Sequence, residues 1–487
     1  MKYILFRFKG MLLLLLCTWI SISLSYGQIH TALFTSSDKE IEGAFEWAKG
    51  MAMSYKGEEN DHVGPWYEAA LPSRFAFCMR DASHQCIGAE ILGWSEQNLN
   101  IFSLFAKNIS VSKDWCSYWE INKWNKPAPE DYRNDKEFWY NLPANFDLLY
   151  ATWRLYQWTG NKSYIEEPNF IYFQEKTVDD YIDKWVLSAD SLFFRPSHVN
   201  VPIPYNEKDY FHSCRGLPSY TEGVPGMKMG ADLVAALYRG LITYSDILKT
   251  KGQTGKADIY ARKAEQYRNS LETEWWSNEN SQYYSYYCDD GKFRNDEPGT
   301  YLLWFDALND IKRKNLTVEQ IITSKSNVEN MSYWPYLLYT NGNWTEARNI
   351  ILRLSDSTTA RREYPEVSFG LLEGVVKGAM GIDPDAEEYS ISTLSRINGG
   401  NSATILDLPI LQTFVDLSHR SDHQSEMTNK GKKSFIWKAK FSGIYASITV
   451  DKSSAPVNKE FDSQGKPITF VMVPMDPGKH ASVEAFK

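Results

Sequence analysis

Three short polar motifs are the places where the chain could carry out chemistry. The first covers residues 80–85 and reads Arg80, Asp81, Ala82, Ser83, His84 and Gln85. Such a density of hydrogen-bonding groups suits a ligand with neighbouring hydroxyls. Asp81 and Ser83 are also good N-cap residues for a helix that we expect to begin near Cys86. Because a cap alone does not account for the last two residues of the motif, we favour ligand binding.

The second motif is a segment rich in glycine and proline, residues 214–230 (CRGLPSYTEGVPGMKMG), which leads into a helix expected from Asp232. Glu222 lies at its centre, beside Gly223. A carboxylate on a constrained loop can be held rigidly and aimed into a cavity. The alternative is that Glu222 only interacts with the positive end of the following helix dipole, which stabilises the helix by under about 1 kcal/mol.

The third motif, residues 363–370 (EYPEVSFG), again precedes a predicted helix, with Glu366 directly after Pro365. Within that helix, glycines recur every four residues at Gly370, Gly374 and Gly378. Each glycine costs roughly 1 kcal/mol against alanine, so a close backbone approach must offset them. We expect helix packing to be the reason, with clearance for a substrate as the second possibility. Glu373 is expected either to act with this motif or to form a structural ion pair.

Aromatic residues surround these motifs and make up 15% of the chain. Sugar rings stack their apolar C–H faces on aromatic rings, but bulky aromatics also build helical cores, and we expect most of them to do the latter. The aromatic-rich segments are Trp115–Trp124 with Trp119, Phe138–Tyr140 with Trp139, Trp275–Trp276, Tyr283–Tyr287 and Tyr333–Trp334.

Composition limits the possible functions. The 487 residues carry 52 Lys and Arg against 61 Asp and Glu, a net charge of -9, so no basic surplus is available for nucleic acid. A mean hydropathy of -0.44 excludes a polytopic membrane protein. The chain has no CxxC or HExxH motif, so we predict no zinc site and no cofactor. Whether calcium is held at an acidic loop such as Asp289-Asp290 stays open. Five cysteines outside the N-terminal segment are predicted to be buried thiols, with a Cys78–Cys86 pair as the alternative.

The first 27 residues have the order of a secretory signal peptide. Basic residues from Lys2 to Lys9 precede an apolar run from Met11 to Ile20, and a polar stretch ends at Gly27. The run is too short for an ordinary membrane span. We therefore predict cleavage before Gln28 and a secreted or periplasmic protein without a membrane span after cleavage.

The elements that must position the motifs are helices up to about residue 382. Residues 232–248 show apolar side chains at three-and-four spacing, and similar stripes occur at 87–105, 146–158, 257–276, 317–322 and 344–354. No glycine-rich dinucleotide loop or P-loop occurs. The predicted fold is mainly α, a ring of helical hairpins over residues 28–385. Residues 386–487 are predicted to form a small antiparallel β-sandwich from alternating runs such as 443–450 and 469–474.

The motifs together resemble the six-hairpin glycosidase superfamily, the (α/α)6-barrel glycoside hydrolases. They are FCMRDASHQ at 77–85, FWYNLPANFDLLYATWRLYQWTGNKSY at 138–164, YTEGVPGMKMGADL at 220–233 and YPEVSFGLLEGVVKGAMGI at 364–382. The resemblance covers about residues 30–385, with a trailing β domain like that beside some α-L-rhamnosidase-type members. The fuller acidic signature common in rhamnosidases is absent.

The resemblance implies an inverting hydrolase with two carboxylates at the mouth of the ring, one acting as acid and one as base. Glu222 resembles the acid and Glu366 the base, and Asp81 is the reserve acid. The residues predicted to bind substrate are Arg80, His84, Gln85, Trp119, Trp139, Asn145, Tyr220 and Trp334.

The predicted substrate is the terminal sugar of an oligosaccharide or polysaccharide, and two other functions stay open. One is a polysaccharide lyase for uronides, for which Tyr220, His212 and Arg215 are available to abstract a proton. The other is a glycan-binding protein without catalysis. The sugar, the linkage and the oligomeric state are not specified by the sequence.

Overall fold

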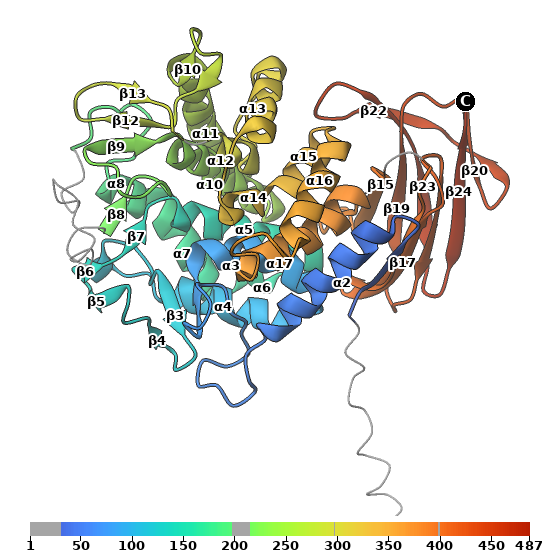
Figure 1. Cartoon of the computed structure of the whole chain (residues 1–487), viewed down its shortest axis with the longest axis horizontal. Helices are drawn as coiled ribbons and strands as arrows, with labels where there is room; N and C mark the ends of the chain where they lie inside the picture. Colours follow the sequence, from blue (N-terminus) through green and yellow to red (C-terminus); the bar gives the residue numbers. More distant parts are fainter. Residues whose placement is uncertain (1–30, 197–214, 297, 398–399) are drawn as a thin grey trace, which may run out of the picture.

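A computed structural model describes residues 31–196, 215–296, 298–397 and 400–487. A helical toroid forms one side of the molecule and a β domain the other (Figure 1). The predicted signal peptide lies outside the described residues. Within the described ranges, no helix combines the length and apolar character needed to cross a membrane.

The helices follow the apolar stripes of the sequence. In α10, for example, the predicted stripe residues Leu233, Leu237 and Leu241 are all fully buried. The longer helices are α2 (Lys39–Ser54), α3 (Met79–Ile91), α4 (Ser95–Lys107), α5 (Ala144–Thr159), α7 (Pro168–Lys176), α10 (Ala231–Thr250), α11 (Thr254–Glu274), α13 (Ile311–Thr323), α16 (Trp344–Ser355) and α17 (Pro365–Glu373). The shorter ones are α6 (Ser163–Glu166), α8 (Ile182–Lys184), α12 (Thr300–Trp304), α14 (Val328–Met331) and α15 (Trp334–Thr340).

Six of these helices contact one another in a closed series. Helix α3 contacts α5, α5 contacts α10, α10 contacts α12, α12 contacts α15, α15 contacts α17, and α17 returns to α3. Further helices pack against members of this series, among them α11 against α10 and α2 against α17. The polar motifs at residues 80–85 and 363–370 therefore lie on neighbouring helices although almost 300 residues separate them.

Two helix boundaries differ from the predictions. The stripe predicted over residues 87–105 is broken between α3 and α4, where Gly93 adopts a positive φ of 80°. Helix α3 begins at Met79 rather than near Cys86, so residues 80–85 form its first two turns and not a preceding loop. Because these residues are polar, they show no apolar spacing from which a helix could be predicted.

The glycine stripe of the third motif is explained by helix packing, as expected. A Cβ at Gly370 would lie 2.5 Å from the Ser332 carbonyl oxygen, and one at Gly374 would lie 2.4 Å from Pro335 Cβ. Helix α17 continues into the π-helical segment η4 (Gly374–Ala379), which packs along α15.

The β domain consists of two sheets, ordered β1-β16-β17-β18-β24-β20-β21 and β14-β15-β19-β23-β22. Their pairs are antiparallel except β15 with β19, which is parallel. The strands are β1 (Leu33–Ser36), β14 (Asp383–Asp385), β15 (Ser390–Leu394), β16 (Ala403–Ile410), β17 (Thr413–His419), β18 (Gln424–Asn429), β19 (Phe435–Ser442), β20 (Ser447–Val450), β21 (Ser453–Ala455), β22 (Asn458–Phe461), β23 (Pro467–Met475) and β24 (His480–Phe486).

The β domain is tied to the helices by an N-terminal strand and by hydrogen bonds. Strand β1, which the sequence analysis placed with the helices, pairs with β16 in the seven-stranded sheet. The indole of Trp158 at the end of α5 donates to the Pro409 carbonyl at 3.0 Å, and the Leu411 N–H donates to the Trp158 carbonyl at 2.8 Å. The β-turn between β16 and β17 is thus anchored to the helical toroid.

Short strands outside the β domain form small sheets along the helical toroid. One of these sheets, β2-β3-β4, carries Cys78 and Glu120 of the site described below. The strands are β2 (Ala76–Cys78), β3 (Glu120–Asn122), β4 (Lys126–Pro127), β5 (Tyr132–Asn134), β6 (Glu137–Phe138), β7 (Tyr140–Asn141), β8 (Arg215–Leu217), β9 (Met227–Gly230), β10 (Trp276–Ser277), β11 (Gln282–Tyr283), β12 (Tyr286–Cys288) and β13 (Phe293–Arg294).

Candidate active site

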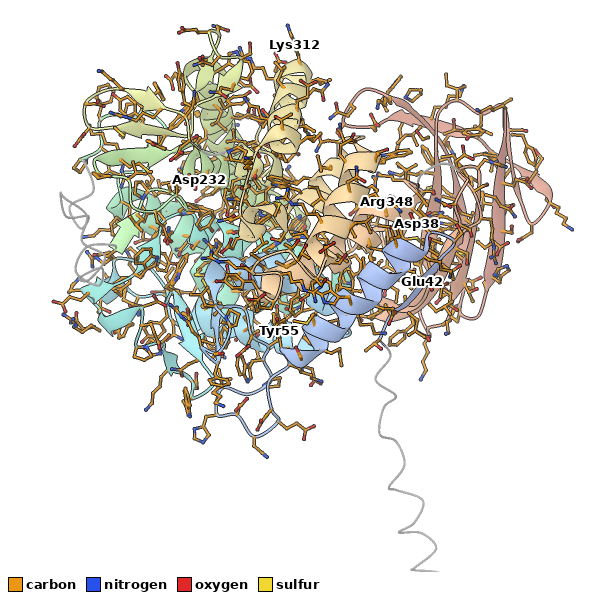
Figure 2. All side chains as sticks on the ribbon, in the orientation of Figure 1. Asp38, Glu42, Tyr55, Asp232, Lys312 and Arg348 are labelled. Atoms are coloured by element: carbon orange, nitrogen blue, oxygen red, sulfur yellow. The ribbon has the colours of Figure 1, made fainter. Side chains whose placement is uncertain are left out.

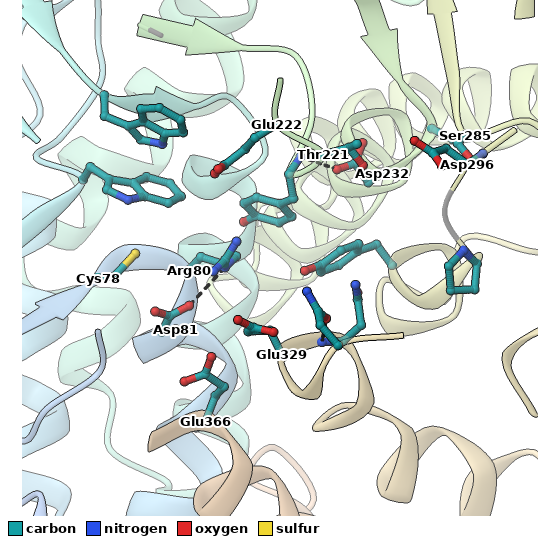
Figure 3. A pocket seen from close by; sticks show the side chains of 18 of the residues that line it. Cys78, Arg80, Asp81, Thr221, Glu222, Asp232, Ser285, Asp296, Glu329 and Glu366 are labelled. Carbon is teal, nitrogen blue, oxygen red and sulfur yellow. Dashed lines mark hydrogen bonds and ion pairs between the residues drawn. The ribbon is translucent and has the colours of Figure 1, made fainter. Parts of the chain in front are cut away.

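A cavity of about 670 Å³ brings the three predicted carboxylates together. Glu222, Glu366 and Asp81 all line it, together with Arg80 and the rings of Trp119, Trp139 and Tyr220 (Figure 3). In the view of Figure 3, Glu222 and Glu366 lie on opposite sides of the cavity, with Arg80 and Asp81 between them. Its volume falls in the range of small-molecule sites in enzymes.

Asp81 and Arg80 enter the cavity from the first turn of α3. Arg80 Nε donates to Asp81 Oδ1 at 3.0 Å, and the guanidinium lies over the Tyr220 ring at 5.5 Å from its centroid. Asp81 is 8% exposed. Burial raises its pKa, with Arg80 acting in the opposite direction. The pair therefore offers a fixed donor and acceptor in the cavity wall.

Glu366 enters from the first turn of α17, where Pro365 occupies the first helical position. It is 5% exposed, and burial followed by repulsion from Asp81 raises its pKa to about 8. The side-chain amide of Gln85, oriented by its hydrogen-bond partners, accepts from the Glu366 N–H at 3.1 Å and donates to the Glu68 carbonyl at 3.2 Å. Gln85 thus fixes the backbone that carries Glu366.

Glu222 lies in the loop between β8 and β9, and its side chain is exposed. The protein atoms around it raise its pKa by reducing solvation, while Arg80 and a hydrogen bond from Asn141 lower it. Asn141 also accepts from the Trp139 indole at 2.8 Å and donates to the Ser219 carbonyl at 2.7 Å. One asparagine therefore connects the catalytic candidate, an aromatic wall and the loop of the second motif.

Four residues predicted to bind substrate do not line the cavity. His84 is buried, stacks on Tyr333 with ring centroids 3.6 Å apart, and contacts Ser332 Oγ at 3.0 Å. Gln85 acts through Glu366, as described above. Asn145 is buried and donates to the Trp115 carbonyl at 3.1 Å, and the Trp334 indole donates to Thr300 Oγ1 at 3.0 Å. These four side chains hold the helices together around the site.

Glu373 and Arg215, whose roles the sequence left open, each form an ion pair within the protein. Glu373 forms a buried ion pair with Arg154, which was one of the two expectations for it. Arg215, considered as a lyase residue, pairs with Asp114 at 2.5 Å and is not among the lining residues. His212 lies outside the described residues.

The sequence analysis missed several acidic residues of the cavity. Arg74 Nη1 bridges Glu120 at 2.7 Å and Asp131 at 3.1 Å, and burial raises the pKa of Glu120 to about 8. Glu329 and Asp232 line other walls. Asp232 accepts from the Tyr220 N–H at 2.6 Å, and burial raises its pKa to about 6.

The missed residues carried weak sequence signals. Glu120 directly follows Trp119 in an aromatic-rich segment, and Asp232 was noted only as the start of a helix. Glu329 lies in the four-residue helix α14, which is too short to show periodicity.

Neither a metal-binding group of side chains nor a cysteine pair occurs in the described ranges. Among those residues, no three His, Cys, Asp or Glu side chains are grouped so as to hold a metal ion. The four described cysteines are free and buried, as predicted: Cys78, Cys86, Cys116 and Cys288.

Comparison with known proteins places the fold. No protein-family model matches the chain, and no curated protein matches its sequence. In structure it is similar to the α-L-rhamnosidase from Dictyoglumus thermophilum, at 13% identity and a TM-score of 0.60, over 94% of this chain and 50% of that one. It is also similar to the GH78 family rhamnosidase of Bacillus sp. GL1, at 12% identity and a TM-score of 0.57, over 83% of this chain and 41% of that one.

The chain thus spans half or less of the length of these two structures. At such identities the likeness concerns the fold. It agrees with the helical ring and the trailing β domain that the sequence predicted.

Proposed function

We propose that the protein is a glycoside hydrolase that removes terminal sugars from oligosaccharides or polysaccharides with inversion at the anomeric carbon. The observation that carries this proposal is the convergence of Glu222 and Glu366, from distant parts of the chain, on one cavity walled by Trp119 and Trp139. Two carboxylates flanking a space for a sugar and a water are the requirement of inverting hydrolysis. The fold similarity to rhamnosidases is consistent with this chemistry but does not identify the sugar.

In the proposed reaction, Glu222 protonates the glycosidic oxygen as the bond to the anomeric carbon breaks. Glu366 takes a proton from a water molecule, whose oxygen bonds the anomeric carbon from the opposite face. The products are a free sugar of inverted configuration and the shortened glycan. Asp81, whose pKa burial also raises, is the alternative acid.

The aromatic and polar walls would orient the sugar. Trp119 and Trp139 offer ring faces for stacking, and the Arg80–Asp81 pair offers a donor and an acceptor for vicinal hydroxyls. We assign these four residues, with Tyr220, to substrate binding. Gln85 is assigned to positioning, because its contact is with the Glu366 backbone.

The test is kinetic and uses Glu366→Gln, Glu222→Gln and Asp81→Asn on a glycoside found by screening aryl glycosides and natural glycans. We expect Glu366→Gln to lower kcat about 10²–10⁴-fold on every substrate. The true acid variant should retain activity on glycosides whose leaving group needs no proton. Because the pKa of Glu366 is raised to about 8, kcat/KM should rise with pH towards that value if Glu366 is the base.

Three results would contradict the proposal. An undiminished rate in Glu366→Gln would remove Glu366 from the base role. Glycan binding without product release across the whole panel would favour the non-catalytic alternative. An ultraviolet-absorbing unsaturated product would indicate the lyase instead, because hydrolysis forms no double bond.

We further propose that the closed series of helices is the inner ring of an (α/α)6 barrel and that residues 1–27 are removed on export. The contacts from α3 through α17 support the ring. The order of charged, apolar and polar segments supports export to the periplasm or medium. N-terminal sequencing of the exported protein should begin at Gln28.

A further inference from the structure

The charge of the cavity wall is strongly one-sided. Two basic side chains line it, Arg74 and Arg80. The acidic side chains among its described lining residues number eight: Asp81, Glu120, Asp131, Glu222, Asp232, Asp296, Glu329 and Glu366. A wall of this composition holds a negative potential wherever these groups are ionised.

Both arginines are already engaged by carboxylates of the wall. Arg74 pairs with Glu120 and Asp131 at 2.7 and 3.1 Å, and Arg80 pairs with Asp81 at 3.0 Å. Proteins that bind a carboxylate ligand usually present an arginine whose paired N–H groups face it. Here each arginine already has a carboxylate of the protein beside it, which offsets its charge towards an anionic sugar.

Glu329 adds to this excess of negative charge in the cavity. It extends from α14 towards Asp81 and Glu366, as Figure 3 shows. Its cationic neighbour is Arg361, 3.5 Å away and 60% exposed. In the part of the chain that the structure describes, Glu329 Oε2 is shielded from solvent and has no hydrogen-bond partner. Repulsion from Glu329 contributes to the raised pKa of both Asp81 and Glu366.

We propose that the cavity accepts only sugars without an acidic group, and that Glu329 is the side chain that excludes uronides. The proposal rests on the proposed function, because it defines the substrate class of the same site. A uronide carboxylate beside Glu329 would meet a second carboxylate, and such like-charge contacts are a common basis of discrimination.

The experiment measures binding and hydrolysis separately. Binding is measured at pH 7 by the quenching of tryptophan fluorescence, to which Trp119 and Trp139 in the wall contribute. The full chain is titrated with the neutral sugars glucose, galactose and rhamnose and, for comparison, with glucuronate and galacturonate. Matched 4-nitrophenyl glucoside and glucuronide, and the galactoside and galacturonide, give the kinetic comparison. At least one neutral sugar should bind about tenfold or more tightly than either uronate, a difference of about 1.4 kcal/mol or more.

Two variants connect the selectivity to Glu329. Glu329→Gln keeps the shape of the side chain and should narrow the ratio of neutral to acidic binding about tenfold. Glu319→Gln removes one negative charge from an exposed position of α13 outside the cavity and should leave the ratio unchanged. Folding of both variants is checked by thermal unfolding.

The outcomes separate the two proposals. The proposed substrate class would be overturned by any of three results. They are a uronate that binds as tightly as its neutral counterpart, an unchanged ratio of neutral to acidic binding in Glu329→Gln, and the absence of binding by any of the sugars. Faster cleavage of a uronide would overturn it too while leaving a glycoside hydrolase. Selective binding of neutral sugars without cleavage of any glycoside would support the substrate class and overturn the hydrolase.

Discussion

Asp38 and Glu366 lie at the starts of two helices that pack together, yet their surroundings shift the pKa of the carboxylate in opposite directions. Asp38 caps α2, accepts from the Ile41 N–H, and binds Arg348 at 2.6 Å near the surface (Figure 2). Its pKa is lowered, chiefly by Arg348. Glu366 lies in the first turn of α17, where burial and Asp81 raise its pKa.

The difference shows which effect dominates at a helix start. Both carboxylates face the positive end of a helix dipole, which is worth roughly 0.3–1 kcal/mol at a surface. That contribution does not prevent the pKa of Glu366 from rising to about 8, because burial and repulsion from Asp81 outweigh the opposite effects of the backbone hydrogen bond and Arg80. A carboxylate with a lowered pKa and one with a raised pKa are therefore distinguished by their neighbours and not by their position on a helix.

The largest effect is expected from removing a partner of a buried carboxylate. Glu373, at the end of α17, is as buried as Glu366 but pairs with Arg154. We expect Arg154→Met to lower the free energy of unfolding by about 3–5 kcal/mol, because Glu373 is then left as an unpaired buried charge. Urea unfolding measures the loss. The double variant Arg154→Met/Glu373→Leu should recover most of it, and a double variant as unstable as the single one would contradict this explanation.

A smaller effect of opposite sign is expected from Glu366→Gln. Because the pKa of Glu366 is higher in the folded than in the unfolded chain, the folded state holds the extra proton and loses stability as pH rises from about 4.5 to about 8. The variant should match the wild type below that window and exceed it by about 1–3 kcal/mol above it. Urea unfolding on both sides of the window tests this. A variant less stable than the wild type at high pH would show that the charged form is not disfavoured.

The smallest effect is expected at Asp38. Its lowered pKa means that its contribution is present above the unfolded pKa near 3.8 and is lost as pH falls through the folded value. Asp38→Ala should cost about 1 kcal/mol at neutral pH and progressively less in acid. Asp38→Asn keeps a capping oxygen and serves as the matched control, so it should lose less. Equal losses in the two variants would assign the stabilisation to Arg348 alone.

The sequence pointed to carboxylates of the cavity where local chemistry marks them. Glu222 among prolines and glycines, and Glu366 after Pro365, were predicted because constrained backbone beside a carboxylate is visible in a single segment. Glu120 and Glu329 were missed, because a three-residue strand and a four-residue helix acquire their meaning only when distant segments pack around the cavity. His84 and Trp334 were misleading, since an aromatic or polar side chain next to a site looks the same in sequence whether it faces the cavity or the core.

The fold was predictable to a similar depth. Long amphipathic helices such as α10 and the alternating strands of the β domain follow from periodicity. The pairing of β1 with β16 does not follow from periodicity, because a four-residue strand near the start of the chain contains no signal for which distant strand it will pair with.

That pairing has a consequence for the order in which the molecule is made. Leu33 pairs with Leu406, so 373 positions separate the two strands in the sequence. At about 5–20 residues per second on the ribosome, the second strand emerges roughly 20–75 s after the first. Throughout this interval the early segment is a β-prone edge without its neighbour, open to association with other nascent chains. The residues of this early strand are therefore among the last to reach their final position.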